Sequence, residues 1–205
     1  MLKIAIFTAI SVVVSLILPE EIAPKIFTVF FAVFFLFGLY FFRDPEREIR
    51  HIEGQILSPA DGKIVKIETI ENDFIGDETV CISIFLSIFN VHVNRMAISG
   101  TVEYIKEIHG KFYGAYREKA SEQNSRVEIG VNAKNYRVIM TQIAGVIARR
   151  INYHLKQNQS VSVGERYGSI QFGSRVDILF PASAIIHAKI GDKVHGGISV
   201  LGEIR

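Results

Sequence analysis

Two long uncharged segments near the N-terminus limit what this chain can fold into more than any other feature. Residues 4–18 and 26–42 contain no charged side chain, and the second segment is dense in phenylalanine. The linker PEEIAPK between them holds two prolines and three charges, so it interrupts any helix. As helices with a rise of about 1.5 Å per residue, these segments span roughly 22–26 Å, slightly less than a hydrocarbon core of about 30 Å. Flanking residues can complete the span, and we interpret residues 1–43 as a membrane-anchoring helical hairpin.

Other interpretations of these segments fit less well. A secretory signal peptide is disfavoured for the first segment, because no small-residue cleavage site follows it. A pair of soluble core helices is disfavoured because neither segment has a polar face. An interfacial anchor that lies in one leaflet stays open beside the spanning hairpin.

Basic residues around the hairpin predict its orientation. Lys3 precedes it and Arg43, Arg47 and Arg50 follow it, whereas the connecting loop carries two glutamates and one lysine. The positive-inside rule then places both ends of the hairpin in the cytoplasm. We therefore expect the remaining domain on the cytoplasmic side of the cell (inner) membrane. Arg43 and Arg47 could also contact lipid phosphate, and the residues alone do not decide between the two roles.

The composition of the chain excludes several classes of function. The net charge is +2 over 205 residues, so nothing points to a nucleic-acid binder or a disordered tail. The single cysteine, Cys81, excludes an internal disulfide framework and a cysteine-based zinc site, and its apolar surroundings favour a buried hydrophobic role. The sequence has no GxGxxG, P-loop or HExxH motif.

From about residue 44 the chain changes to short alternating runs separated by Gly, Asp and Asn, which predict strands. The best helix candidate in this part is GVIARRINYHL (145–155). We predict an α+β fold, with a β-rich, barrel-like catalytic domain over residues 44–205 after the hairpin. The predicted strands are KIVKIETI (63–70), CISIFLSI (81–88), SGTVEYIKEI (99–108), RVEIGV (126–131), YRVIMTQIAG (136–145) and VDILF (176–180).

Two stretches of the domain look related to each other. SPADGKIVKIE (58–68) and AKIGDKVHGGISVLGEI (188–204) each place a Gly-Asp turn before β-branched residues, as in small lipoyl-like and hybrid-motif barrels. A carrier domain would need a lysine at a hairpin tip, and neither Lys63 nor Lys193 sits in such a motif. The similarity therefore favours a barrel scaffold without a carrier function.

The stretch SIQFGSRVDILF (169–180) reads as a strand with a glycine and a serine in its middle. A β-bulge is the simplest explanation of Gly173. The nucleophile-elbow pattern GxSxG is absent, but Ser174 could attack its own preceding carbonyl, with Gly173 supplying a flexible acyl side. Such an attack needs a base held by a third group. His92 and Asp61 are candidates, although the chemistry alone does not favour His92 over the five other histidines: His51, His109, His154, His187 and His195.

Six motifs occur in an order that narrows these choices. FFRDPER after an apolar hairpin, SPADGKIVKIE, IFLSIFNVHVNR, GKFYGA, QIAGVIARRI and FGSRVDILFP follow one another along the chain. Together they resemble the short, membrane-anchored form of the phosphatidylserine decarboxylase family. The resemblance runs from about residue 41 to the C-terminus.

This resemblance implies a complete mechanism. The chain would cleave itself between Gly173 and Ser174 into a large and a small chain, and Ser174 would become a pyruvoyl group. Asp61, His92 and Ser174 would form the self-cleavage triad, with His92 as base and Asp61 fixing its tautomer. The pyruvoyl group would then support decarboxylation of phosphatidylserine to phosphatidylethanolamine, with no metal or diffusible cofactor. The implied partners are phosphatidylserine in the membrane and further copies of the chain in a homo-oligomer, without nucleic acid.

Some features leave alternatives open. Arg175 follows the serine, as in the short form, where long-form relatives carry Ser or Thr. Asn94 and Arg95 stand where long-form relatives show a second histidine, and we assign them no role. The alternatives are a decarboxylase of an ether-linked serine lipid (archaetidylserine type), a pyruvoyl enzyme for a soluble amino acid, and a non-enzymatic membrane-anchored β-barrel adaptor.

Overall fold

The computed structural model of the chain describes residues 22–110, 123–145, 150–170 and 173–204. It divides into two compact units, Met1–Arg43 and Asp44–Arg205, and each is described by itself.

The first unit contributes one apolar helix to the described residues, α2 (Ile22–Phe41). Its 20 residues span about 30 Å, which matches a hydrocarbon core. The window Pro24–Phe41 has a mean hydropathy of 1.9, so by length and composition this helix can cross a membrane. The helix begins four residues before the predicted segment, because Pro24 falls in the first turn, where its missing N–H is not needed. The first predicted segment, 4–18, lies outside the described residues, so the helical hairpin is not observed.

The described part of the second unit is mostly β, whereas the sequence predicted a mixed α+β domain. Its strands are β1 (Gln55–Leu57), β2 (Gly62–Asn72), β3 (Gly76–Leu86), β4 (Val93–Arg95), β5 (Gly100–Ile108), β6 (Arg126–Ala133), β7 (Tyr136–Ile143), β8 (Ile151–Tyr153), β9 (Ser160–Val161), β10 (Arg166–Ile170), β11 (Ser174–Pro181), β12 (Ile185–Ile186), β13 (Lys193–Val194) and β14 (Val200–Glu203). All six predicted strands occur at their expected places.

The predicted helix at 145–155 is wrong in its described part. Ile151–Tyr153 forms β8, which pairs antiparallel with β10, so that Ile151 lies opposite Ile170. A short apolar pattern fits either a helix or a strand, and here the backbone hydrogen bonds offered by β10 decide in favour of the strand.

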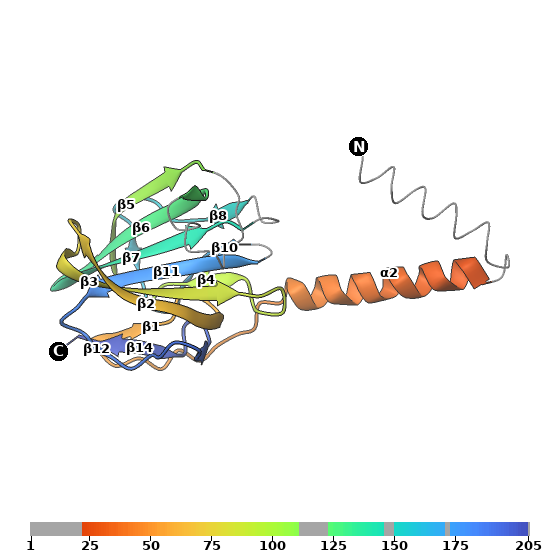
Figure 1. The fold of residues 1–205 in the computed structure, drawn as a ribbon, viewed down its shortest axis with the longest axis horizontal. Coiled ribbons are helices and arrows are strands. Elements are labelled where there is room, and N and C mark those ends of the chain that lie inside the picture. Colours follow the sequence, from red (N-terminus) through yellow and green to blue (C-terminus); the bar gives the residue numbers. More distant parts are fainter. Residues whose placement is uncertain (1–21, 111–122, 146–149, 171–172, 205) are drawn as a thin grey trace. The chain divides into compact units, whose positions relative to one another are not determined.

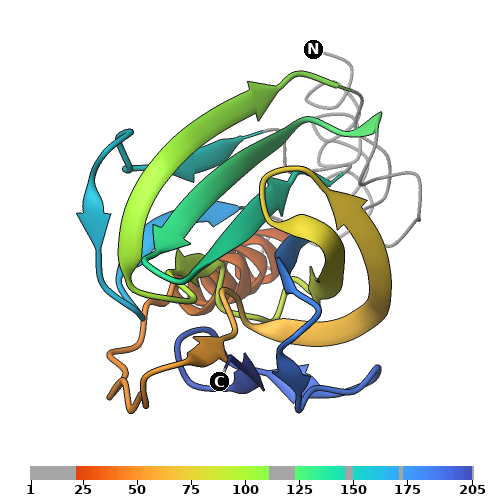
Figure 2. The same ribbon diagram turned by 90° about the vertical axis from the view of Figure 1, so that its left-hand side faces the viewer.

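The largest sheet has eight strands in the order β13-β2-β3-β11-β7-β6-β5-β9. Two sheets of three strands, β1-β14-β12 and β4-β10-β8, complete the described part of the unit (Figure 1). Figure 2 shows that the long strands bend strongly, so that the large sheet curls into a half-barrel. This curvature is the observed form of the predicted barrel-like scaffold.

Strand β11 lies inside the large sheet and is covered on both faces. Val176, Ile178 and Phe180 point into the main hydrophobic core, and Leu179 packs on the other face with Cys81 and Ile139. The alternation in VDILF predicted one buried face, but seven of the eight residues of β11 are buried. The start of this strand is therefore held in a rigid environment.

The two stretches that look related in sequence lie side by side. Lys193 of β13 pairs with Lys63 of β2, and Val194 pairs with Gly62. The turn after β13 reaches the turn before β2, where the Gly196 amide donates a hydrogen bond of 2.8 Å to Asp61. The sequence similarity between the stretches thus corresponds to a paired substructure.

Candidate active site

Ser174 is the first residue of β11 and is completely buried. It pairs with Leu86 of β3, and the next residue, Arg175, pairs with Phe85 of β3 and Ile143 of β7. Within the part of the chain that the structure describes, the Ser174 hydroxyl has no hydrogen-bond partner. Burying a hydroxyl without a partner costs about 1–3 kcal/mol, so this arrangement calls for a reason.

Gly173 has the conformation that only glycine adopts easily. Its φ is +62°, in the left-handed region. A Cβ built on this residue would meet nothing within 4 Å. Backbone conformation, and not lack of space, therefore favours glycine before Ser174.

His92 lies beside the end of β10, the strand that precedes Gly173 in the chain. It is buried directly before β4, and its carbonyl accepts a hydrogen bond of 3.2 Å from the Ile170 amide at the end of β10. Ile170 precedes Gly173 by three residues in the chain, so the pairing of β4 with β10 places the His92 backbone beside the last described residue before Gly173. In the same strand, the buried Asn94 accepts a hydrogen bond of 2.8 Å from Gln142 of β7.

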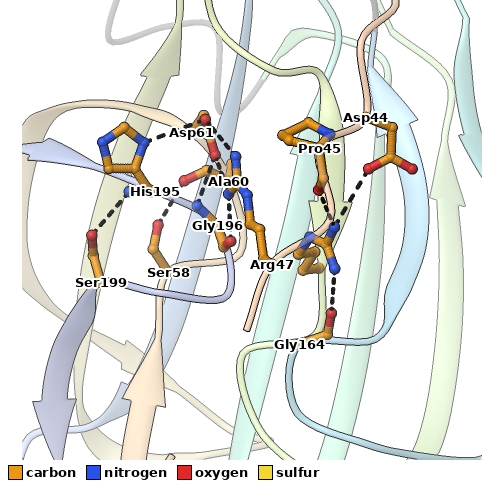
Figure 3. Close-up of polar contacts among 11 residues, drawn as sticks. Asp44, Pro45, Arg47, Ser58, Ala60, Asp61, Gly164, His195, Gly196 and Ser199 are labelled. Carbon is orange, nitrogen blue, oxygen red and sulfur yellow. Dashed lines mark hydrogen bonds and ion pairs between the residues drawn. The ribbon is translucent and has the colours of Figure 1, made fainter. Parts of the chain in front are cut away.

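Asp61 forms a buried ion pair with Arg47 (Figure 3). Two Arg47 nitrogens donate to the two carboxylate oxygens over 2.6 and 2.9 Å. The Gly196 amide donates to Oδ1, and Nδ1 of His195 lies 3.5 Å from Oδ2, at the long limit of a hydrogen bond. The polar partners of the carboxylate in the described residues are thus Arg47, Gly196 and His195, and its contact with His92 stays a prediction.

These contacts decide the charge state of Asp61. Burial by itself would raise the pKa of this carboxyl, but the hydrogen bonds from Arg47 and Gly196, the positive charge of Arg47 and the contact with His195 outweigh burial and lower the pKa below its usual value. Asp61 is therefore a carboxylate at neutral pH, as an orienting group requires.

The sheet register brings Asp61 and Ser174 to the same end of the large sheet. Lys63 of β2 pairs with Phe85 of β3, and Phe85 pairs in turn with Arg175 of β11. Because both pairings are antiparallel, β2 and β11 run in the same direction, and Asp61 and Ser174 stand just before these aligned residues. Adjacent strands are about 4.8 Å apart, so the two backbones lie about 10 Å from each other at this end.

Comparison with known proteins identifies the family. The family model described as phosphatidylserine decarboxylase matches residues 34–202. The chain belongs to the phosphatidylserine decarboxylase family. This finding confirms the resemblance seen in the six motifs.

Relatives within the phosphatidylserine decarboxylase family match over most of their length. A protein from Chlorobium phaeovibrioides is 38% identical over 204 residues, which cover 100% of this chain and 93% of the relative. A protein from Chlorobium phaeobacteroides is 43% identical over 171 residues, covering 83% of this chain and 81% of the relative. One from Desulfotalea psychrophila is 43% identical over 182 residues, covering 88% and 85%. Each of the three is named phosphatidylserine decarboxylase proenzyme.

Two contacts of Asp61 in this decarboxylase family member escaped sequence reasoning. Arg47 was interpreted as a topology signal or a lipid contact, but its side chain is only 8% exposed and binds Asp61. His195 was one of five undistinguished histidines, and it lies next to Asp61 because β13 pairs with β2. In the sequence, the motif FFRDPER contains Arg47, and the second of the two related Gly-Asp stretches contains His195. These two features were the available indications that the residues belong to the site.

Two further residues have structural roles in this family member. Arg175 forms a buried two-pronged ion pair with Asp177, at 2.6 and 2.7 Å, so its charge is already compensated within β11. Burial raises the pKa of the Cys81 thiol to about 12. Cys81 is thus a protonated core residue, as the sequence indicated.

Proposed function

We propose that this chain is a proenzyme that cleaves itself between Gly173 and Ser174 and then decarboxylates phosphatidylserine to phosphatidylethanolamine. The observation that carries the proposal is the buried Ser174 hydroxyl, unpaired within the described ranges, directly after a glycine at positive φ. A buried polar group without a partner is uncommon in a stable core, and a catalytic role is one explanation for it. Family membership supplies the reaction class, a carboxy-lyase reaction that depends on a serine-derived pyruvoyl group.

The cleavage uses only groups of the chain itself and water. The Ser174 hydroxyl oxygen attacks the Gly173 carbonyl carbon, and the amide bond is exchanged for an ester while the amine of Ser174 is released. Loss of the Ser174 α-proton then expels the Gly173 carboxylate and leaves dehydroalanine at position 174. Water converts dehydroalanine into the pyruvoyl group and ammonia. Gly173 has a left-handed backbone conformation, and a Cβ built on it would meet nothing within 4 Å, so the acyl side of the bond has local space for this rearrangement.

His92 and Asp61 have separate roles in this scheme. His92 takes the proton from the Ser174 hydroxyl and returns it to the amine that leaves. Asp61 holds the tautomer of the imidazole and stabilises its protonated form, which agrees with a carboxylate that stays ionised at neutral pH. The positions of both residues at the Ser174 end of the sheet support these assignments.

After cleavage the position of residue 174 determines the chemistry. A pyruvoyl carbonyl supplies an electron acceptor for the bond that breaks when carbon dioxide leaves the substrate. The chain holds residue 174 at the end of a strand that is paired on both sides, which fixes its orientation and limits access of water. His92, buried beside the same segment, is placed to hold the proton that the product carbon requires.

The apolar N-terminal unit explains how the enzyme meets its lipid. We propose that α2 is one half of a membrane hairpin whose other half is the segment 4–18, and that Asp44–Arg205 lies on the cytoplasmic side of the inner membrane. The length and hydropathy of α2 and the basic residues at the ends of the hairpin support this topology. A homo-oligomer is part of the same proposal, and light scattering of the purified protein in detergent tests it.

The experiment that tests the function is an intact mass spectrum of the purified, denatured protein. We expect two chains that meet at Gly173 and Ser174, with the small chain carrying a keto oxygen in place of its amine. The variant Ser174→Ala should give one full-length chain without decarboxylase activity towards phosphatidylserine vesicles. Cleavage of Ser174→Ala at the same bond, or an uncleaved wild-type chain with full activity, would contradict the proposal.

A further inference from the structure

We infer that Arg47 is a positioning residue for self-cleavage, which aims the Asp61 carboxylate at the histidine of the triad. The inference rests on the proposed function, since it needs Asp61 to orient that histidine. It makes the juxtamembrane strap, which we define as Asp44–Arg47, a working part of the active site. This strap begins three residues after the end of α2 in the chain.

Arg47 fixes the carboxylate in both position and rotation. Its two-pronged contact joins Nη1 to Oδ1 at 2.6 Å and Nη2 to Oδ2 at 2.9 Å. Such a planar pairing of guanidinium and carboxylate defines the orientation of both groups. Nη1 also donates to the Gly196 carbonyl over 2.5 Å, and the Gly196 amide donates to Oδ1 of Asp61. The side chains of Arg47 and Asp61 are only 8% and 6% exposed, so water competes little with these bonds.

The strap is itself held at several points, which explains why Arg47 stays in place. Arg95 is buried and donates to the Pro45 carbonyl over 3.2 Å and to the Gly164 carbonyl over 3.1 Å (Figure 3). Arg166 binds Asp44 and Glu46, each over 2.7 Å. The strap is thus bound to the last residue of β4 and the first residue of β10, in addition to Asp61.

The pattern of bonds on Asp61 leaves room for one further donor. Among the described residues, Oδ1 accepts hydrogen bonds from both Arg47 and Gly196, whereas Oδ2 accepts one bond of 2.9 Å from Arg47 and otherwise has the 3.5 Å contact with His195. A carboxylate offers about four lone-pair sites, so Oδ2 can still accept an imidazole N–H.

The test measures the rate of self-cleavage, which does not depend on decarboxylase activity. The full-length chain is synthesised in a cell-free system with lipid vesicles, and the appearance of two chains is followed on gels from pH 5 to pH 9. The variants are Arg47→Gln and Arg47→Lys, with Arg50→Gln as the matched control, because Arg50 pairs with Glu48 at the surface. Asp61→Asn is measured in parallel, and each variant is also made with Ser174→Ala to compare thermal unfolding of the uncleaved chain.

We expect Arg47→Gln to slow cleavage at least tenfold at pH 7, and its rate should fall further at the acidic end because Asp61 loses the partner that keeps it ionised. Arg47→Lys should cleave at an intermediate rate, because lysine keeps the positive charge but cannot form the two-pronged contact. Arg50→Gln should cleave at the wild-type rate. If Arg47→Gln proves unfolded, the cleavage rate of Arg47→Lys tests the inference: a rate below that of the wild type supports it, and a wild-type rate overturns it. If both Arg47 variants cleave at the wild-type rate with an unchanged pH profile while Asp61→Asn cleaves slowly, the role of Arg47 is wrong but the role of Asp61 stands. A wild-type rate for Asp61→Asn would overturn the assigned role of Asp61 as well.

Discussion

Ser174 and Leu86 form the end pair of the β11–β3 ladder, so the proposed cleavage frees the N-terminus of a strand that stays paired on both sides. The small chain, residues 174–205, contributes β11, β12, β13 and β14 to two different sheets. Cleavage therefore cuts the backbone at a strand end without removing any ladder.

The two chains should consequently remain associated after cleavage. We expect the cleaved protein to elute as one species in detergent and to separate only after unfolding in guanidinium. Size-exclusion chromatography followed by denaturing gels of the peak measures this. Elution of a free small chain without denaturant would show that β11 is not held as the structure indicates.

Gly173→Ala should slow cleavage and lower stability modestly. Alanine at φ +62° carries a strain of roughly 1–2 kcal/mol, although its Cβ has space. The strain favours a different backbone conformation at residue 173, next to the bond that is cut. We therefore expect the cleavage rate to fall while the fold persists. Gly191→Ala is the matched control, because Gly191 also has positive φ and open space but lies far along the chain from residue 174. Equal cleavage rates for the two variants would contradict a special role of the Gly173 conformation.

The two histidines near the site should behave differently. His92→Ala should reduce the rate of self-cleavage by about 10²–10⁴-fold, the usual contribution of a general base. His195→Ala should have a much smaller effect, because its ring is mostly exposed and its contact with Asp61 is long. The exposed His154 gives a further control. The reverse order of the two effects would assign the base to His195 and correct the triad.

Cys81 should not react with thiol reagents in the folded protein. With a pKa of about 12, the thiol is ionised in only about one molecule in 10⁴ at pH 8, and its burial against Ile139 and Leu179 blocks access. We expect no alkylation by iodoacetamide over hours, and complete alkylation once the chain is unfolded. Rapid modification of the native protein would mean that this face of the sheet opens.

Acid should remove part of the stability that Asp61 provides. Its folded pKa is lowered, so its contribution is fully present above the unfolded value of about 3.9 and is lost as the pH falls through the folded value. In the uncleaved Ser174→Ala chain, Asp61→Asn should therefore lower the melting temperature most at pH 7, and the gap to the parent should narrow below about pH 4. Thermal unfolding followed by circular dichroism at several pH values measures this, with the exposed Asp73→Asn as control. A gap that stays constant with pH would mean that the ionised form is not favoured by folding.

The sequence determined the features that depend on local pattern. Alternating runs predicted the strands of the large sheet, because side chains alternate across a pleated strand whatever the rest of the fold does. The uncharged run at 26–42 predicted the apolar helix because its length and apolar character suit a membrane-spanning helix. Six motifs in order pointed to the family, and family membership carries the reaction with it.

Only the tertiary structure decided which residues meet. The partners of Asp61 are Arg47, Gly196 and His195, which are separated from it by 14 to 135 residues in the chain. No local pattern encodes such contacts, since they follow from the pairing of β13 with β2 and from the docking of the strap. The same holds for residues 151–153, where pairing with β10 overrode a helical pattern. Local sequence sets the period of side chains along a segment, whereas hydrogen bonds and burial supplied by distant segments decide the structure and neighbours that each segment finally has.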